Sequence, residues 1–261
     1  MGNDITSRIL YLSGACAVVN KLSGEAVEGA GPGMGDLPRL LAAGLTANGN
    51  VPDKLSLPAA VHRLDVPVTG CAVFALTRPA LRFLNAVFSR DTVFVAEGSD
   101  EPPVPAVEKQ YWAILETPPD AGTIPAAATL RHWVRFDSRQ NKSIAYDTPG
   151  PGRKTAVLRY RLIGRGRNYL FLAIALLTGR HHQIRAQLAR LGLHIKGDLK
   201  YGARRSEKEG GIRLHARSLS FPGPSGGGER ISVAAEPPLR DNLWTAFEES
   251  FNTSAAESGE N

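Results

Sequence analysis

Residues 61–70 read Val-His-Arg-Leu-Asp-Val-Pro-Val-Thr-Gly, and this stretch decides how the rest of the chain is interpreted. An imidazole, a guanidinium and a carboxylate lie within the four residues from His62 to Asp65, and a proline and a glycine follow. Regular structure does not tolerate this order, so we expect a tight loop that leads into an apolar strand at residues 71–76. A carboxylate held there is costly unless it is paired. Composition alone favours a salt-bridged turn.

A second stretch, residues 178–185, reads Thr-Gly-Arg-His-His-Gln-Ile-Arg. We expect it to join the end of a strand to the start of a helix, where free backbone N–H groups favour anions. Two arginines and two histidines at this point strengthen the case for an anion site. A solvated basic turn explains the same residues, and the stretch by itself does not decide between the two.

The composition is that of a folded protein. The chain has 261 residues, of which 43% are hydrophobic and 21% charged, so wholesale disorder is excluded. Cys16 and Cys71 are the only cysteines, which excludes a disulfide framework and a Cys-x-x-Cys zinc site. We find no signal peptide and no apolar run long enough for a membrane helix, and we expect a cytoplasmic protein. The net charge of +6 suggests an anionic partner.

Apolar periodicity indicates the α+β class. Alternation predicts strands at residues 111–115, 130–136, 156–163, 169–177, 213–221 and 230–235. Three helices are predicted to begin after the N-cap residues Asp36, Thr77 and Asp241. A fourth is predicted over residues 182–191. We therefore expect one domain over residues 9–251 with a mixed, mainly antiparallel central sheet, and a disordered tail at residues 252–261.

Several short segments gain meaning from their order. They are Val-Asn-Lys-x-x-Gly at 19–24, Lys-x-Tyr-x-Ala at 109–113, Gly-Asp-x-x-Tyr-Gly at 197–202 and Leu-His-Ala at 214–216. Together with His-Arg-Leu-Asp at 62–65 and Gly-Arg-x-His-Gln-Ile-Arg at 179–185, they resemble the pseudouridine synthases of the RluA type. The resemblance runs from about residue 9 to about residue 245. The chain departs from the family at Leu22, His181 and Thr69, where Pro, Thr and Ser are usual.

The resemblance implies a catalytic domain with an active-site cleft that isomerises uridine to pseudouridine in ribosomal or transfer RNA. It implies that Asp65 is the catalytic carboxylate, that Arg185 pairs with it, and that Tyr111 stacks on the target uracil. Asp65 would act as nucleophile at the sugar, as nucleophile at the base, or in proton removal, and the sequence leaves these roles open. It also implies a set of substrate-binding residues: Arg63, His62, Lys109 and Ile184. For the last three, structural support of the loops is the alternative, and the sequence does not decide between the two.

Such a reaction needs no cofactor and no metal, so we expect none, and we expect RNA as the partner of a monomer that does not bind membranes. The family's frequent small N-terminal RNA-binding domain is expected to be missing. One alternative is a catalytically silent RNA-binding protein of the same fold. Another is a metal-dependent hydrolase, which the six histidines disfavour because they contain no His-Glu-x-x-His pattern.

A basic segment follows the Gly-Asp-x-x-Tyr-Gly motif. It contains Arg204, Arg205 and Lys208, and a Gly-Gly pair comes soon after. We expect a mobile loop that holds the RNA backbone. A charged loop that only aids solubility is the alternative.

Overall fold

The computed structural model describes residues 4–49, 57–89, 106–119, 122, 124–224 and 228–258. The chain divides into two compact units, and each unit is built from two stretches of sequence. Unit 1 comprises Met1–Lys109 and Ala216–Pro238, and unit 2 comprises Gln110–His215 and Leu239–Asn261. The single domain over residues 9–251 stays a prediction.

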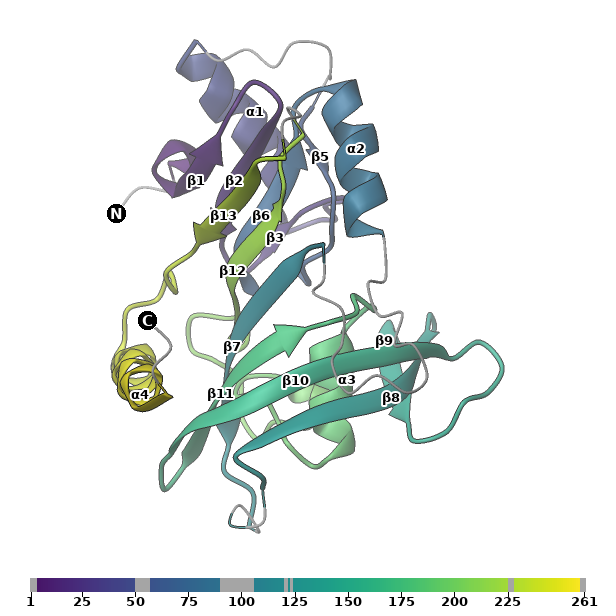
Figure 1. The fold of residues 1–261 in the computed structure, drawn as a ribbon, viewed down its shortest axis with the longest axis vertical. Helices are drawn as coiled ribbons and strands as arrows, with labels where there is room; N and C mark the ends of the chain where they lie inside the picture. The colour runs from purple at the N-terminus through teal and green to yellow at the C-terminus, as the bar shows by residue number, and fades with distance from the viewer. Residues whose placement is uncertain are drawn as a thin grey trace. The chain divides into compact units, whose positions relative to one another are not determined.

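Unit 1 carries the N-terminal strands and two helices (Figure 1). Its elements are η1 (Ile5–Arg8), β1 (Ile9–Leu12), β2 (Cys16–Lys21), β3 (Glu25–Ala26), β4 (Gly35–Asp36), α1 (Leu37–Ala47), β5 (Ala59–Ala60), β6 (Thr69–Ala75), α2 (Arg78–Phe88), most of β12 (Leu214–Pro222) and β13 (Arg230–Ala234). The strands are ordered β1-β2-β6-β12, with β13 on β12 and β5 on β6. Helix α2 packs against β6.

Local capping explains where both helices of unit 1 begin. The Asp36 side chain accepts a hydrogen bond from the N–H of Arg39, and the Thr77 side chain accepts one from the N–H of Ala80. Each cap satisfies a backbone donor that has no partner inside its helix. Both N-caps predicted from the sequence are therefore confirmed. The core beneath α2 joins Leu84 to apolar side chains of β2, β6 and β12.

Unit 2 is built on antiparallel strands ordered β7-β11-β10-β8-β9. Its elements are most of β7 (Glu108–Glu116), β8 (Ala127–Asp137), β9 (Lys142–Tyr146), β10 (Lys154–Arg165), β11 (Tyr169–Leu176), α3 (Gln183–Arg190), η3 (Leu199–Tyr201) and α4 (Asn242–Ser258). Helix α3 packs against β8 and β9, and α4 packs against β10. Phe247 of α4 closes a core with Trp112 of β7 and Phe171 of β11.

The last helix is longer than the sequence predicts. Asp241 accepts a hydrogen bond from the N–H of Trp244, as expected for its N-cap. The helix continues to Ser258, so residues 252–258 are helical rather than part of a disordered tail. Two contacts explain the extension: Phe251 packs on Trp112, and Arg161 donates a hydrogen bond to Ser254 at 3.1 Å. Residues 259–261 lie outside the described part of the chain.

The fold class is confirmed. The resolved strand pairings within the units are antiparallel, apart from the short parallel pair β3–β4, and four α-helices accompany the strands in the described residues. This is the mixed, mainly antiparallel α+β architecture that the sequence predicts. The helices that the structure describes are each too short or too polar to cross a bilayer.

Candidate functional site

Unit 1 holds the loop that carries Asp65. Its apolar residues Val61, Leu64 and Val68 are buried, which ties the loop to the core, whereas Asp65 itself is only half-buried. The N–H of Val68 donates to the Asp65 carbonyl at 3.0 Å and closes a tight turn directly after the carboxylate. The expected loop is therefore confirmed. Its fixed backbone also fixes the position from which the Asp65 side chain extends.

Lys21, the last residue of β2, supports the backbone of the Asp65 loop. Its side chain is fully buried, and its ammonium group donates to the carbonyls of Leu22, Val66 and Val68 at 2.9, 3.0 and 2.6 Å. Three carbonyls match the three donors of a protonated amine. The Val-Asn-Lys segment was recognisable in the sequence, but nothing in its spacing indicated that this lysine supports the Asp65 loop.

Burial makes Lys21 unusual electrostatically. Desolvation lowers the pKa of Lys21 from 10.5 to about 7, although the negative charges of Glu25 and Asp65 act in the opposite direction. Glu25 is itself held by Arg8 through two hydrogen bonds of 2.9 Å. The base of the Asp65 loop is thus a buried polar cluster, and such clusters fix geometry when their members are satisfied.

His62 has a structural contact that the sequence does not reveal. Its Nε2 accepts a hydrogen bond from the N–H of Val73 at 3.2 Å, and its ring stacks on Phe88 with centroids 5.2 Å apart. Desolvation of the ring and the positive charge of Lys109 lower the pKa of His62 to about 3. The neutral His62 ring therefore fixes the loop to β6. The Lys109 ammonium lies 5.2 Å from the centre of the same Phe88 ring. Arg63 is exposed.

Unit 2 holds the other predicted residues. Tyr111 lies on β7 opposite Ile174 of β11 and is 5% exposed, so its ring sits within the packed part of the unit. Ile184 and Arg185 lie in the first turn of α3 and are both buried. The structure thus divides the predicted set: His62, Arg63, Asp65 and Lys109 belong to unit 1, whereas Tyr111, Ile184 and Arg185 belong to unit 2.

Gln183 fixes the start of α3. Its Oε1 accepts hydrogen bonds from the Thr178 hydroxyl at 2.8 Å and from the N–H of Arg180 at 2.9 Å, and its Nε2 donates to the Val157 carbonyl of β10. His182, the N-cap, adopts a left-handed conformation with φ of +50°. A non-glycine residue in that region is uncommon, and here the bonds of Gln183 on its C-terminal side hold the turn in place.

Arg185 has a partner that the sequence did not indicate. Its Nε and Nη2 donate to the two carboxylate oxygens of Asp198 at 2.7 and 2.8 Å, and both side chains are buried. This two-point geometry fixes the plane of the guanidinium and compensates its buried charge. Asp198 belongs to the Gly-Asp-x-x-Tyr-Gly motif, which was visible in the sequence without an assigned role. The predicted pairing of Arg185 with Asp65 stays a prediction.

A row of four contacting aromatic rings begins beside Arg185. Its guanidinium carbon lies 4.8 Å from the centre of the Tyr201 ring, and the Tyr201 hydroxyl lies 3.1 Å from Nδ1 of His182. His182 stacks on His181 at 3.8 Å, and His181 meets the edge of Phe136 at 4.4 Å. Phe136 is 47% exposed, so the row joins buried Arg185 to the surface of unit 2.

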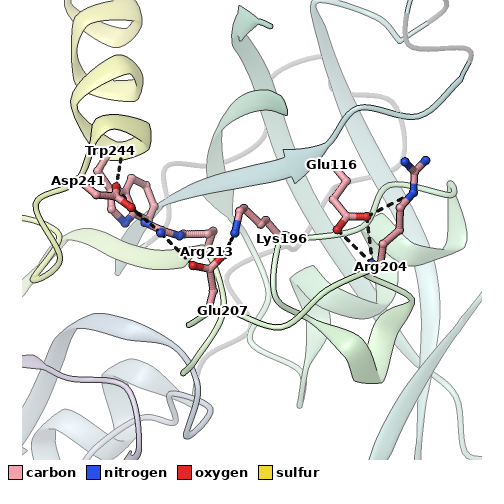
Figure 2. A network of polar contacts seen from close by, with 7 residues as sticks. All are labelled: Glu116, Lys196, Arg204, Glu207, Arg213, Asp241 and Trp244. Carbon is pink, nitrogen blue, oxygen red and sulfur yellow. Dashed lines mark hydrogen bonds and ion pairs between the residues drawn. The ribbon is translucent and has the colours of Figure 1, made fainter. Parts of the chain in front are cut away.

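The basic segment at residues 204–208 is anchored rather than free. Glu207 forms ion pairs with Lys196 and Arg213, and the N–H of Arg204 donates to Glu116 at 3.1 Å (Figure 2). The sequence predicted a mobile loop because of the nearby Gly210 and Gly211. These carboxylate contacts hold the segment at two points. Its mobility stays a prediction.

Comparisons with known proteins find a matching family and similar proteins. The profile of a family described as RNA pseudouridylate synthase matches residues 15–190. RNA pseudouridine synthase 4, mitochondrial, from Arabidopsis thaliana is 31% identical over 201 residues, which are 76% of this chain and 41% of that protein. Ribosomal large subunit pseudouridine synthase D from Zymomonas mobilis is 28% identical over 251 residues, which are 90% of this chain and 70% of that protein.

A solved structure shares the fold. The chain superposes on human RNA Pseudouridylate Synthase Domain Containing 4 with a TM-score of 0.67 and 19% sequence identity. The match covers 95% of this chain and 94% of the human one. At this identity the likeness concerns the fold alone.

Proposed function

Because this chain belongs to the RNA pseudouridylate synthase family, we propose that it isomerises uridine to pseudouridine in ribosomal RNA with Asp65 as the catalytic carboxylate. The observation that carries the proposal is the braced loop of unit 1. Lys21 holds the carbonyls of Val66 and Val68, so the backbone that bears Asp65 is fixed while its side chain is only half-buried. A fixed carboxylate avoids the cost of ordering it during the reaction.

The chemistry is an exchange of bonds within one nucleotide. The bond between the sugar C1′ and N1 of the base breaks, the base turns, and a bond between C1′ and C5 forms. The proton on C5 leaves and N1 gains one, so the reaction is balanced without an oxidant or a reductant. Asp65 acts as nucleophile at the sugar, as nucleophile at the base, or in proton removal, and each role requires an ionised carboxylate.

The remaining predicted residues serve this reaction in the proposal. Arg185, held by Asp198, supplies a fixed positive charge for the carboxylate, and Tyr111 supplies an aromatic surface for the flipped uracil. Four residues complete the binding of the substrate: Arg63, His62, Lys109 and Ile184. Arg63 contacts the RNA, and His62 acts by holding the Asp65 loop against β6.

The decisive experiment replaces the carboxylate by its amide. Asp65→Asn keeps the shape of the side chain and removes its charge, so formation of pseudouridine in an unmodified large-subunit ribosomal RNA transcript should fall below detection. Asp36→Asn is the matched control, because asparagine is as good an N-cap as aspartate and the helix is unaffected. Both variants should unfold at the same urea concentration as the wild type. Normal turnover by Asp65→Asn would contradict the proposal.

The same assay separates the alternatives. A catalytically silent RNA-binding protein would bind the transcript and form no pseudouridine in ribosomal or transfer RNA. A metal-dependent enzyme would lose its activity when a chelator is present, whereas the proposed reaction should proceed unchanged. The predicted monomer is tested by light scattering of the active protein, and the predicted cytoplasmic location by imaging a tagged chain.

A further inference from the structure

Unit 2 contains a pocket of about 850 Å³ that the proposed reaction does not use. Its wall is formed by the turn between β10 and β11, by residues 204–209 and by the residues just before and at the start of α4. None of the residues assigned above to the uridine site lines it. The pocket therefore needs an explanation of its own.

Carboxylates build the base of this pocket. Glu207 accepts from Lys196 and, at 2.9 Å, from Arg213, and its side chain is 8% exposed. Arg213 also donates to both oxygens of Asp241, at 3.1 and 2.5 Å. Figure 2 shows these contacts converging from four parts of unit 2: Lys196, the 204–208 segment, the residue before β12 and the residue that caps α4. The base is thus internally neutralised and fixed in shape.

The rim of the pocket is positively charged. Arg167, Arg205 and Lys208 line it and are exposed, and among the described residues none of the three forms an ion pair. Glu209 is the carboxylate that lines the pocket without a cationic partner in the described residues, so the unpaired groups carry a net charge of +2. A cluster of like charges on an anchored backbone repels itself, and a bound anion relieves that repulsion.

The rim also carries an aromatic ring. Tyr169, the first residue of β11, lines the pocket, and the Lys196 ammonium lies 5.8 Å from the centre of its ring. Cations that track a phosphate backbone beside an aromatic ring are the combination that binds single-stranded nucleic acid. A free inorganic anion has no base that could stack on the ring.

We propose that this pocket is a phosphate-binding subsite for the substrate RNA, in which Arg167, Arg205 and Lys208 contact phosphates outside the target uridine. This inference rests on the proposed function, because it takes RNA as the substrate. The anchoring of residues 204 and 207 fixes the chain on both sides of Arg205 and next to Lys208, so this segment loses little backbone conformational entropy when the RNA arrives.

The test removes the three rim charges together as Arg167→Ala, Arg205→Ala and Lys208→Ala. The matched control removes three exposed cations from elsewhere in unit 2 as Arg131→Ala, Arg139→Ala and Lys154→Ala, which changes the net charge equally. The affinity of each protein for an unmodified large-subunit ribosomal RNA transcript is measured between 50 and 200 mM salt.

Each lost phosphate contact should lower the slope of log affinity against log salt by about 0.7 to 0.9, so the rim variant should lose about 2 to 3 in slope. The control should keep the wild-type slope. A rim variant with the wild-type slope, or a control that loses as much slope as the rim variant, would overturn the inference.

The two proposals fail differently in this experiment. A wild-type protein that binds the transcript with the expected slope difference but forms no pseudouridine would overturn the proposed function and leave the phosphate subsite intact. A wild-type protein that forms pseudouridine without a slope difference would overturn the subsite alone. Absence of RNA binding by the wild-type protein would overturn both.

Discussion

Lys21 offers a sharp test of the buried cluster below the Asp65 loop. The substitution Lys21→Met keeps an unbranched side chain of similar length and removes the amine that three backbone carbonyls share. Because the pKa of Lys21 is lowered in the folded protein, its contribution to stability depends on pH, and the substitution should abolish that dependence.

The magnitude follows from the size of the pKa change. The pKa of Lys21 falls from 10.5 in the unfolded chain to about 7 in the folded protein. Between these values the unfolded chain holds a proton that the folded protein has released, so raising the pH favours folding. At about 1.4 kcal/mol for each pKa unit, burial of the charge costs about 5 kcal/mol below pH 7, and this cost fades as the pH rises.

The assay is urea unfolding of both proteins from pH 6 to pH 9. The free energy of unfolding of the wild type minus that of Lys21→Met should rise by about 2 kcal/mol between pH 7 and pH 9, and should be flat below pH 6. Lys154→Met, at an exposed lysine, should show no such rise. A constant difference between wild type and Lys21→Met over the whole range would refute the reasoning.

Three further outcomes are expected from urea unfolding. Asp198→Asn removes the charge that compensates buried Arg185, and the free energy of unfolding should fall by about 3 kcal/mol; a loss below about 0.5 kcal/mol would contradict the pairing. Gly70 has a φ of +111° and an added Cβ would lie 2.3 Å from the Ala216 carbonyl oxygen, so Gly70→Ala should cost at least about 2 kcal/mol, and a neutral variant would argue against this close approach. Burial raises the pKa of Glu207, but hydrogen bonds from its two cationic neighbours outweigh it and hold the pKa below 4.5, so its stabilisation is present above pH 4.5 and is lost as the pH falls through the lowered pKa. The stability difference between wild type and Glu207→Gln should therefore shrink in acid, and an unchanged difference would speak against the ion pairs.

Local signals in the sequence were sufficient for much of the fold. Asp36, Thr77 and Asp241 are N-caps because a short polar side chain precedes an apolar periodic run, and this rule involves only neighbours. Period-two patterning likewise located β8, along which buried and more exposed residues alternate. The apolar residues 156–158 helped to locate β10, where all three are buried.

Elements that depend on distant partners were not predictable in this way. Strand β9 has five residues and pairs with β8, and its own sequence carries too short a pattern to be recognised. The end of α4 reads as a polar tail because its stabilising contact, Phe251 on Trp112, joins residues far apart in the sequence. Tertiary packing overrides local composition in both cases.

The candidate site shows the same division. The order of the motifs led to the prediction of Asp65, Tyr111 and Arg185 as site residues, and this stays a prediction. Their supports were not visible: Asp198 lies 13 residues from Arg185, and Lys21 lies 45 residues from Val66. No periodic rule links such positions, so the groups that fix the geometry of a site emerge only from the folded chain.

The interleaved course of the chain has a consequence for its synthesis. Strand β6 of unit 1 has β2 on one side and β12 on the other, and the Asn20 side chain donates to the carbonyl of Glu236 at 2.8 Å. Residues 110–213 of unit 2 are translated between β6 and β12, so the edge of β6 that pairs with β12 has no β12 partner throughout that interval. The core of unit 2 is likewise incomplete until α4 has been translated, because Phe247 of α4 is part of that core. A ribosome that pauses within residues 110–215 therefore exposes an aggregation-prone edge, and we expect chaperone occupancy of the nascent chain to peak there.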